Sequence, residues 1–239
     1  MLMAKGQKRL AVETRVPEVT KQLVKENTFN FVKARDVTHS AVLKAARQLI
    51  EDMNYGFSTK EIEEEKILKK LSKKDEVAPG IFVLEMFSGE IFERLCKKKV
   101  RIIGPLTILQ TEGKRDQTIL MAEDIPIKSQ YMRNRTVTIS SQGLKADKKV
   151  IHKYVQRMGG VATKVYTTKV NMVIADDLTS EKCKLAREQG NEIYLSQLAM
   201  KCWNLSEKNE LVDVEKMLWK YRIPVFHNFK ISISGVSHS

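Results

Sequence analysis

The sequence predicts an α/β protein built from small tandem repeats, each a short parallel sheet flanked by helices. Short β-branched or apolar runs alternate with amphipathic helical patterns along most of the 239 residues, and such alternation is typical of a parallel sheet covered by helices. The same order of patterns appears at residues 28–110 and again at 131–206. We therefore expect two similar units, and a chain of this length has room for both cores.

Alternation and helical periodicity place the elements of the first unit. Its expected strands are residues 29–32, 81–84 and 100–103. Its expected helices are residues 37–53, 60–72 and 89–97. The second of these helices is heavily charged, and Ser58 or Thr59 would cap its amino terminus.

The second unit opens with a β-branched strand at residues 136–140 and a turn at Gly143. An amphipathic helix is expected from Leu144, and Gly159 and Gly160 would end it. The remaining expected strands are 161–163, 170–174 and 192–195, and the remaining expected helices are 180–188 and 196–205.

Four further segments carry weaker patterns. Residues 1–27 are rich in charged side chains and are expected to form a flexible basic arm. Residues 110–130 and 206–224 are expected to be linkers, the second with a charged amphipathic piece near Trp219. Residues 226–239 are expected to form only the first strand of a truncated further repeat.

Composition points to an anionic partner. The formal net charge is +13, which attracts nucleic acid, acidic lipid or phosphorylated protein. The three cysteines have no metal-site spacing, and no catalytic or phosphate-loop motif occurs. No apolar run reaches the length of a membrane span and no signal core is seen. We expect an intracellular, non-enzymatic protein without cofactor or metal.

Four stretches resemble the BRCT family of phosphopeptide-reading repeats. They are residues 137–140, 152–160, 170–175 and 180–186. The resemblance implies a binding module of DNA replication and DNA-damage checkpoint signalling, located in the nucleus. By the same resemblance, phosphorylated proteins would be its partners.

Two groups within the family have similar repeats. Residues 87–92, 101–105 and 152–160 are similar to the topoisomerase-II-binding group of replication and checkpoint scaffolds, which begin with a degenerate, zeroth repeat. On this comparison residues 28–110 are the zeroth repeat, and the implied partners are the phosphorylated checkpoint clamp tail and phosphorylated replication-initiation factors. The alternative is the autoinhibitory amino-terminal region of a Rho guanine-nucleotide exchange factor of cytokinesis.

The resemblance also implies a phosphate-binding site in the second unit. A phosphate group needs a hydroxyl, a backbone N–H and a cation in convergent positions. Gly143 would supply the N–H, Lys182 the main cation and Lys148 a second cation. The hydroxyl position falls on Gln142, which departs from the family pattern, so its amide or the neighbouring Ser141 would take that role.

Each of these assignments has an alternative. Lys148 and Lys182 can also be interpreted as solvated lysines on helix surfaces. The alternative function for the basic chain is sequence-independent binding to the DNA backbone, and a phosphoprotein scaffold of this charge could also make a weak DNA contact. The first unit lacks the hydroxyl–glycine pair after its first strand and is expected not to bind phosphate. Trp203 is expected in the core, replacing the Trp that such repeats usually carry at the position of Leu198.

Overall fold

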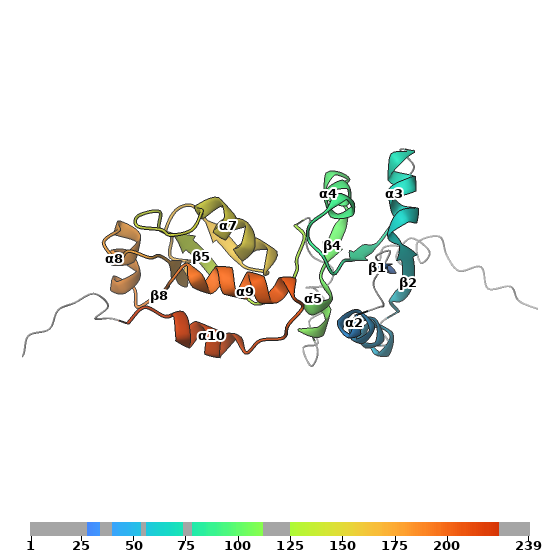
Figure 1. The fold of residues 1–239 in the computed structure, drawn as a ribbon. Helices are drawn as coiled ribbons and strands as arrows, with labels where there is room; N and C mark the ends of the chain where they lie inside the picture. The colour runs from blue at the N-terminus through green and yellow to red at the C-terminus, as the bar shows by residue number, and fades with distance from the viewer. Residues whose placement is uncertain (1–27, 34–39, 54–55, 74–77, 112–124, 225–239) are drawn as a thin grey trace, which may run out of the picture.

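The computed structural model describes residues 28–33, 40–53, 56–73, 78–111 and 125–224. The expected arm at 1–27 and the expected strand at 226–239 lie outside the described residues. Two α/β units lie side by side, and each contains one four-stranded parallel sheet (Figure 1). The predicted fold class is confirmed.

The first unit has the strand order β2-β1-β3-β4, and every pairing is parallel. Its strands are β1 (Thr28–Lys33), β2 (Ser58–Glu63), β3 (Ile81–Val83) and β4 (Arg101–Ile103). Its helices are α2 (Ala41–Asp52), α3 (Glu64–Ser72), α4 (Glu90–Lys97) and α5 (Pro105–Leu109). Apolar side chains of α2 and α5 cover one face of the sheet, whereas those of α3 and α4 belong to the cluster on the other face.

The expected helix at residues 60–72 is wrong over its first four residues. Residues 58–63 form strand β2, which pairs with β1 along six consecutive residues, from Thr28 with Ser58 to Lys33 with Glu63. Helix α3 begins only at Glu64, with Glu63 at the N-cap position. The charged sequence looks helical in isolation, but backbone pairing at a sheet edge outweighs a weak local preference.

The second unit repeats this arrangement with the order β6-β5-β7-β8, again all parallel. Its strands are β5 (Thr136–Ile139), β6 (Val161–Thr163), β7 (Met172–Ile174) and β8 (Glu192–Tyr194). Its helices are α7 (Lys148–Arg157), α8 (Glu181–Glu188), α9 (Gln197–Glu207) and α10 (Val214–Tyr221). Helices α7 and α9 share one face, and α8 packs on the other.

Helix α7 begins one turn later than the sequence pattern suggested. Asp147 is the N-cap, and its carboxylate accepts a hydrogen bond from the backbone N–H of Lys149. Leu144 therefore belongs to the loop that precedes the helix. Gly159 ends the helix with φ of +78°, as expected of a glycine at this position.

Neither expected linker is a linker throughout. In the first, residues 112–124 lie outside the described part, but Ile127 bridges to Ile103, and Lys128 and Ser129 are fully buried. In the second, α10 packs on α9 with Leu218 buried. Each segment packs apolar side chains against the sheets and helices, and its backbone forms hydrogen bonds with the ends of the strands.

The two units share a single hydrophobic cluster. It runs from Phe92 and neighbouring residues of the first unit to residues of α7 and α9 in the second. The guanidinium of Arg157 on α7 lies 4.8 Å from the ring centre of Phe92 on α4. The hydroxyls of Ser129 and Ser206 are 2.7 Å apart in the same buried region. Residues 125–135 thus hold the two repeats together.

Trp203 lies in the core, as the sequence predicted. Its side chain is 6% exposed and stacks on Tyr154, with ring centres 4.5 Å apart and planes 6° from parallel. Leu198 is fully buried one turn earlier on the same helix. A Trp at 203 therefore fills volume at the junction of α7 and α9, where an aromatic side chain buries a large area.

Gly104 offers a stability test of this shared core. An added Cβ would lie 2.3 Å from the carbonyl oxygen of Lys128, and the Gly104 N–H donates to Ile127 O at 2.7 Å. Gly104→Ala is expected to cost about 3 kcal/mol, because it pushes the connecting segment away. Gly190→Ala is the control: its Cβ meets nothing, and only the φ of +69° opposes it, at about 1 kcal/mol. Equal unfolding free energies of the two variants in urea would contradict the expectation.

Candidate phosphate-binding site

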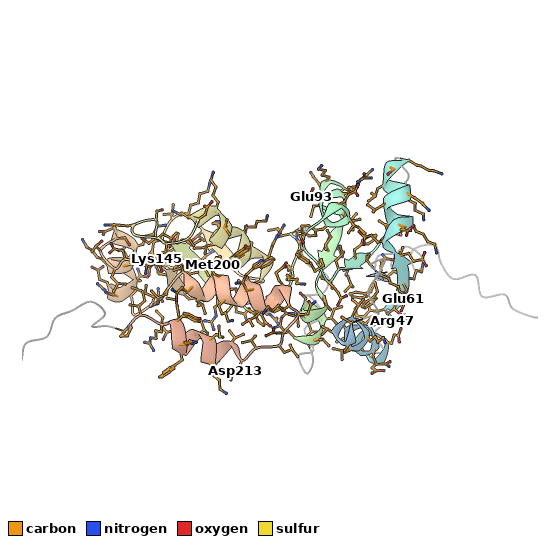
Figure 2. The ribbon with its side chains drawn as sticks, viewed as in Figure 1. Arg47, Glu61, Glu93, Lys145, Met200 and Asp213 are labelled. Carbon is orange, nitrogen blue, oxygen red and sulfur yellow. The ribbon has the colours of Figure 1, made fainter. Side chains whose placement is uncertain are left out.

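The predicted site residues lie where β5 ends and where α7 and α8 begin. Residues 141–143 follow β5 after the single residue Ser140. Lys148 is the first residue of α7, and Lys182 is the second residue of α8. Lys145 in the intervening loop is labelled in Figure 2. The carboxyl ends of parallel strands and the amino termini of helices meet here, an arrangement that favours anions.

Lys148 and Ser141 form a direct pair. The Lys148 ammonium donates to the Ser141 hydroxyl oxygen at 2.8 Å, and both residues lie at the surface. Because that oxygen acts as acceptor, its own proton is available to a ligand. Gln142 is exposed and forms no hydrogen bond within the described part of the chain. Of the two residues, Ser141 is therefore better placed than Gln142 to donate a side-chain hydrogen bond to a phosphate.

Lys182 is held by three hydrogen bonds from its ammonium group. Its acceptors are the Thr138 hydroxyl at 3.0 Å, the Ile139 carbonyl at 3.0 Å and the Lys164 carbonyl at 2.7 Å. These three bonds use all the donors of an ammonium group. A phosphate at Lys182 would exchange with one of these acceptors or act through the charge of the group, so Lys182 is not a freely solvated surface lysine.

The charges at the site favour an anion. Burial lowers the pKa of Lys182, and the nearby charge of Lys148 lowers that pKa further. Neither ammonium forms an ion pair with a carboxylate among the residues that the structure describes. Two neighbouring cations without a counter-ion repel each other, and a bound dianion would relieve that repulsion.

Gly143 is required by the close approach of another loop. Its φ is +61°, and an added Cβ would lie 2.6 Å from the Cβ of Asp177. The carboxylate of Asp177 accepts from the Thr179 hydroxyl and from the Thr179 N–H, each at 2.7 Å, and these bonds lower the pKa of Asp177. Asp177 thus places a fixed negative charge beside the turn, which limits how deeply an anion can enter.

Asp176 fixes the shape of the loop. It accepts from the Lys145 N–H at 2.8 Å and from the Ser196 N–H at 2.9 Å and hydroxyl at 2.6 Å. Burial acts to raise the pKa of Asp176, but these hydrogen bonds outweigh it and the net shift is downward. The charged carboxylate therefore ties the loop before α7 to the start of α9.

Sequence reasoning missed several residues that shape the site. Thr138 and Ser140 lie on the face of β5 opposite Val137 and Ile139, as strand alternation requires. Thr138 holds Lys182, whereas the buried Ser140 hydroxyl has no partner among the described residues. The polar residues Thr138 and Ser140, which alternate with apolar residues along this segment, are the sequence signal that could have predicted a polar site here.

Metal sites and membrane-spanning helices are both absent from the part of the chain that the structure describes. No group of His, Cys, Asp and Glu within it is arranged to hold a metal ion. None of its helices combines the length and the apolar character needed to span a bilayer. The segment that follows β1 in the first unit lies outside the described residues, so the expectation that this unit binds no phosphate stays a prediction.

Comparison with known proteins gives a family match for part of the chain. Residues 136–193 match the family described as twin BRCT domain. Protein ECT2 of Homo sapiens is 24% identical over 159 residues, which are 66% of this chain and 17% of that protein. Protein ECT2 of Mus musculus is 25% identical over the same length. The chain thus spans about a sixth of these relatives.

Solved structures with tandem repeats are also similar. Yeast Rtt107 matches 82% of this chain and 44% of its own, with a TM-score of 0.41 and 10% identity. The first two BRCT repeats of Rad4, solved with a Crb2 phosphopeptide, match 81% of this chain and 97% of their own, with a TM-score of 0.30 and 12% identity. The family match covers β5 to β8, and the first unit repeats their strand order. Residues 136–193 thus resemble a BRCT repeat, and both units have the same parallel strand order.

Proposed function

We propose that this protein is a scaffold module whose second repeat binds a phosphorylated segment of a partner protein. The observation that carries the proposal is the meeting of Ser141, Lys148 and Lys182 beyond β5, with two cations that no described carboxylate neutralises. A phosphoserine supplies close to two negative charges and three acceptor oxygens, which fit one hydroxyl, one turn N–H and two ammonium groups. BRCT domains are in general interaction modules without catalytic activity.

The biological setting is a finer part of the proposal. The sequence is similar to the topoisomerase-II-binding group of scaffolds, so we place the module in DNA replication and checkpoint signalling in the nucleus. Its partners would be the phosphorylated checkpoint clamp tail and phosphorylated replication-initiation factors. Phosphopeptides of Crb2 and Mdb1 bound to Rad4 provide precedents in other proteins.

Two alternatives are separable by experiment. An autoinhibitory region of a Rho exchange factor would bind the catalytic part of its own chain. We would therefore measure the affinity of this protein for that catalytic part and for phosphopeptides, and compare the two affinities. A non-specific DNA binder would lose several powers of ten in affinity as salt rises. A pocket for one phosphate is expected to lose far less over the same range.

Lys148→Glu is expected to weaken phosphopeptide binding about tenfold and Ser141→Ala about fivefold. The first change removes a charge-assisted hydrogen bond, the second a neutral one. Gln142→Thr is expected to strengthen binding, because it adds a hydroxyl beside the turn. Fluorescence anisotropy with a panel of phosphopeptides, each beside its unphosphorylated twin, measures all three effects.

Lys149→Glu is the matched control for Lys148→Glu. Both residues lie in the first turn of α7, but Lys149 is exposed, and the hydrogen bond to Ser141 comes from Lys148. The two variants have the same net charge, so long-range electrostatics change equally. Equal losses of affinity in the two variants would show that binding depends on overall charge, not on this site.

A further inference from the structure

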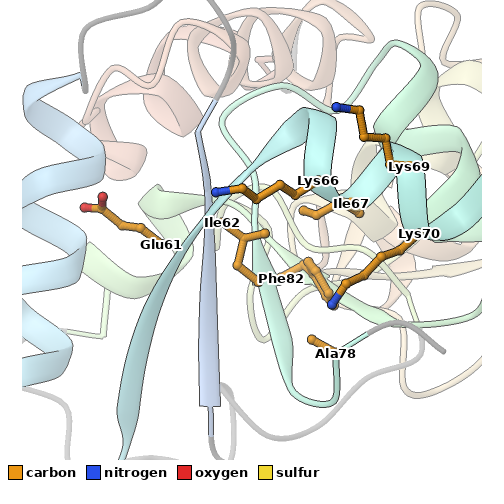
Figure 3. Close-up of a pocket in the computed structure, with 8 residues that line it drawn as sticks. All are labelled: Glu61, Ile62, Lys66, Ile67, Lys69, Lys70, Ala78 and Phe82. Carbon is orange, nitrogen blue, oxygen red and sulfur yellow. The ribbon is translucent and has the colours of Figure 1, made fainter. Parts of the chain in front are cut away.

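A cavity of about 450 Å³ lies on the first repeat, on the α3 side of its sheet (Figure 3). Its apolar lining comes from Ile62, Ile67, Ala78 and Phe82. Its charged lining comes from Glu61, Lys66, Lys69 and Lys70. Figure 3 shows the Lys70 side chain running toward Ala78 and Phe82, so an ammonium group lies beside the apolar floor.

The helix that builds this cavity is an addition to the repeat. In the second unit β6 is joined to β7 by residues 164–171, none of which is helical. In the first unit the corresponding connection contains α3, which buries Ile67 and leaves its lysines exposed. The α3 wall of the cavity therefore has no counterpart in the connection between β6 and β7.

The rim of the cavity carries three lysines and one glutamate, and the glutamate is paired with an arginine outside the cavity. Lys66 pairs with Glu63 at 3.0 Å and Lys69 with Glu65 at 4.0 Å, but the two lysine side chains are 69% and 76% exposed. Exposed pairs along a helix contribute little and exchange readily with other partners. Lys70 has no ion pair among the described residues. Glu61 is engaged by Arg47 of α2, and the pair is labelled in Figure 2.

We propose that this cavity binds an acidic, unphosphorylated peptide segment of a partner protein, with an apolar side chain of the segment on the floor. The half-buried Ile62 and Ala78 suit an apolar group. Lys70, together with Lys66 and Lys69 whose own ion pairs are exposed, suits carboxylates around that group. Single-stranded nucleic acid fits less well, because base stacking needs an exposed aromatic face and Phe82 is fully buried. The first repeat would then provide a second binding surface in addition to the phosphate site of the second repeat.

The probe is a fluorescein-labelled twelve-residue peptide with two central leucines flanked on each side by aspartates and glutamates. Lys66→Glu combined with Lys70→Glu is expected to weaken its binding to the full chain at least tenfold. Ala78→Phe is expected to weaken binding by a similar factor without changing any charge, because the ring occupies the floor. Replacing both leucines of the probe by serine is expected to have the same effect.

Lys97→Glu combined with Lys98→Glu is the control for charge. These residues lie at the exposed end of α4, outside the cavity, and the double change alters the net charge equally. Losses as large as those of the cavity double variant, or unchanged binding in Ala78→Phe, would overturn the proposal. Tighter binding of a twelve-nucleotide single strand to the same residues would also overturn it. Melting temperatures check that each variant folds.

The phosphate site provides an independent reference. Lys148→Glu is expected to leave binding of the acidic probe within twofold of the parent, because Lys148 lies on the second repeat. A failure of the cavity proposal would leave the phosphopeptide result of that variant untouched. If Lys148→Glu removes both ligands, the acidic probe binds at the phosphate site and the cavity proposal is wrong.

Discussion

Lys182→Glu is expected to weaken phosphopeptide binding about a hundredfold and to destabilise the second repeat by about 2 kcal/mol. The substitution removes a cation that lies near Lys148 and places a carboxylate against the carbonyl oxygens of Ile139 and Lys164. The sequence alone predicts that this change leaves the fold intact, because an exposed lysine on a helix surface contributes little to stability. The three internal hydrogen bonds correct that premise.

Lys182→Gln separates the two effects. Its amide can still donate to one of the carbonyls but carries no charge, so the loss of stability is expected to be smaller than for Lys182→Glu, and the loss of affinity about tenfold. Titration calorimetry with one phosphopeptide and urea unfolding would give both quantities. Full affinity in a folded Lys182→Gln variant would mean that Lys182 only anchors α8 to β5.

Lys128→Met is expected to remove a rise in stability of about 3 kcal/mol between pH 8 and pH 10.5. Lys128 is fully buried between the repeats and donates to Glu85 O and, at 3.0 Å, to the side-chain oxygen of Asn209. Burial lowers the pKa of Lys128 from 10.5 to about 8, although the carboxylates of Glu207 and Glu85 act in the opposite direction.

The sign follows from proton binding. Between pH 8 and 10.5 the unfolded chain keeps the Lys128 proton that the folded chain has lost, so the free energy of unfolding rises with pH. Each pKa unit corresponds to about 1.4 kcal/mol. Below pH 8 both states are protonated, and this contribution to the pH slope disappears.

Other buried groups oppose this slope, so the parent must be compared with the variant. Burial raises the pKa of Cys202 from 9.0 to about 12 and also raises the pKa of Tyr131, which lowers stability as the unfolded chain ionises above about pH 9. These contributions are the same in parent and variant and cancel in the difference. A difference in unfolding free energy that stays constant from pH 7 to 10 would contradict the lowered pKa of Lys128.

Local sequence patterns are enough to predict the α/β class, the two units and most of their helices and strands. The β-branched run at 136–139, the glycines at 159 and 160 and the capped helix after Ser180 are local signals, and short-range backbone preference is enough to produce them. The family resemblance predicted that Trp203 lies in the core in place of the Trp usual at the position of Leu198, and Trp203 is buried there against Tyr154. The family resemblance added the site residues, which periodicity alone does not identify.

Packing between distant segments fixes the features that local backbone preference leaves open. Residues 58–63 became a strand because β1 offered an unpaired edge. Residues 127–130, Leu218 and Ile223 are buried because they pack against elements of the two sheets that lie far away in the sequence. The internal partners of Lys182 come from β5 and from the loop after β6, 18 to 44 residues away. The cavity beside α3 likewise depends on β2, β3 and α3 meeting in space. Contacts over such distances depend on packing, and no sequence window contains both partners.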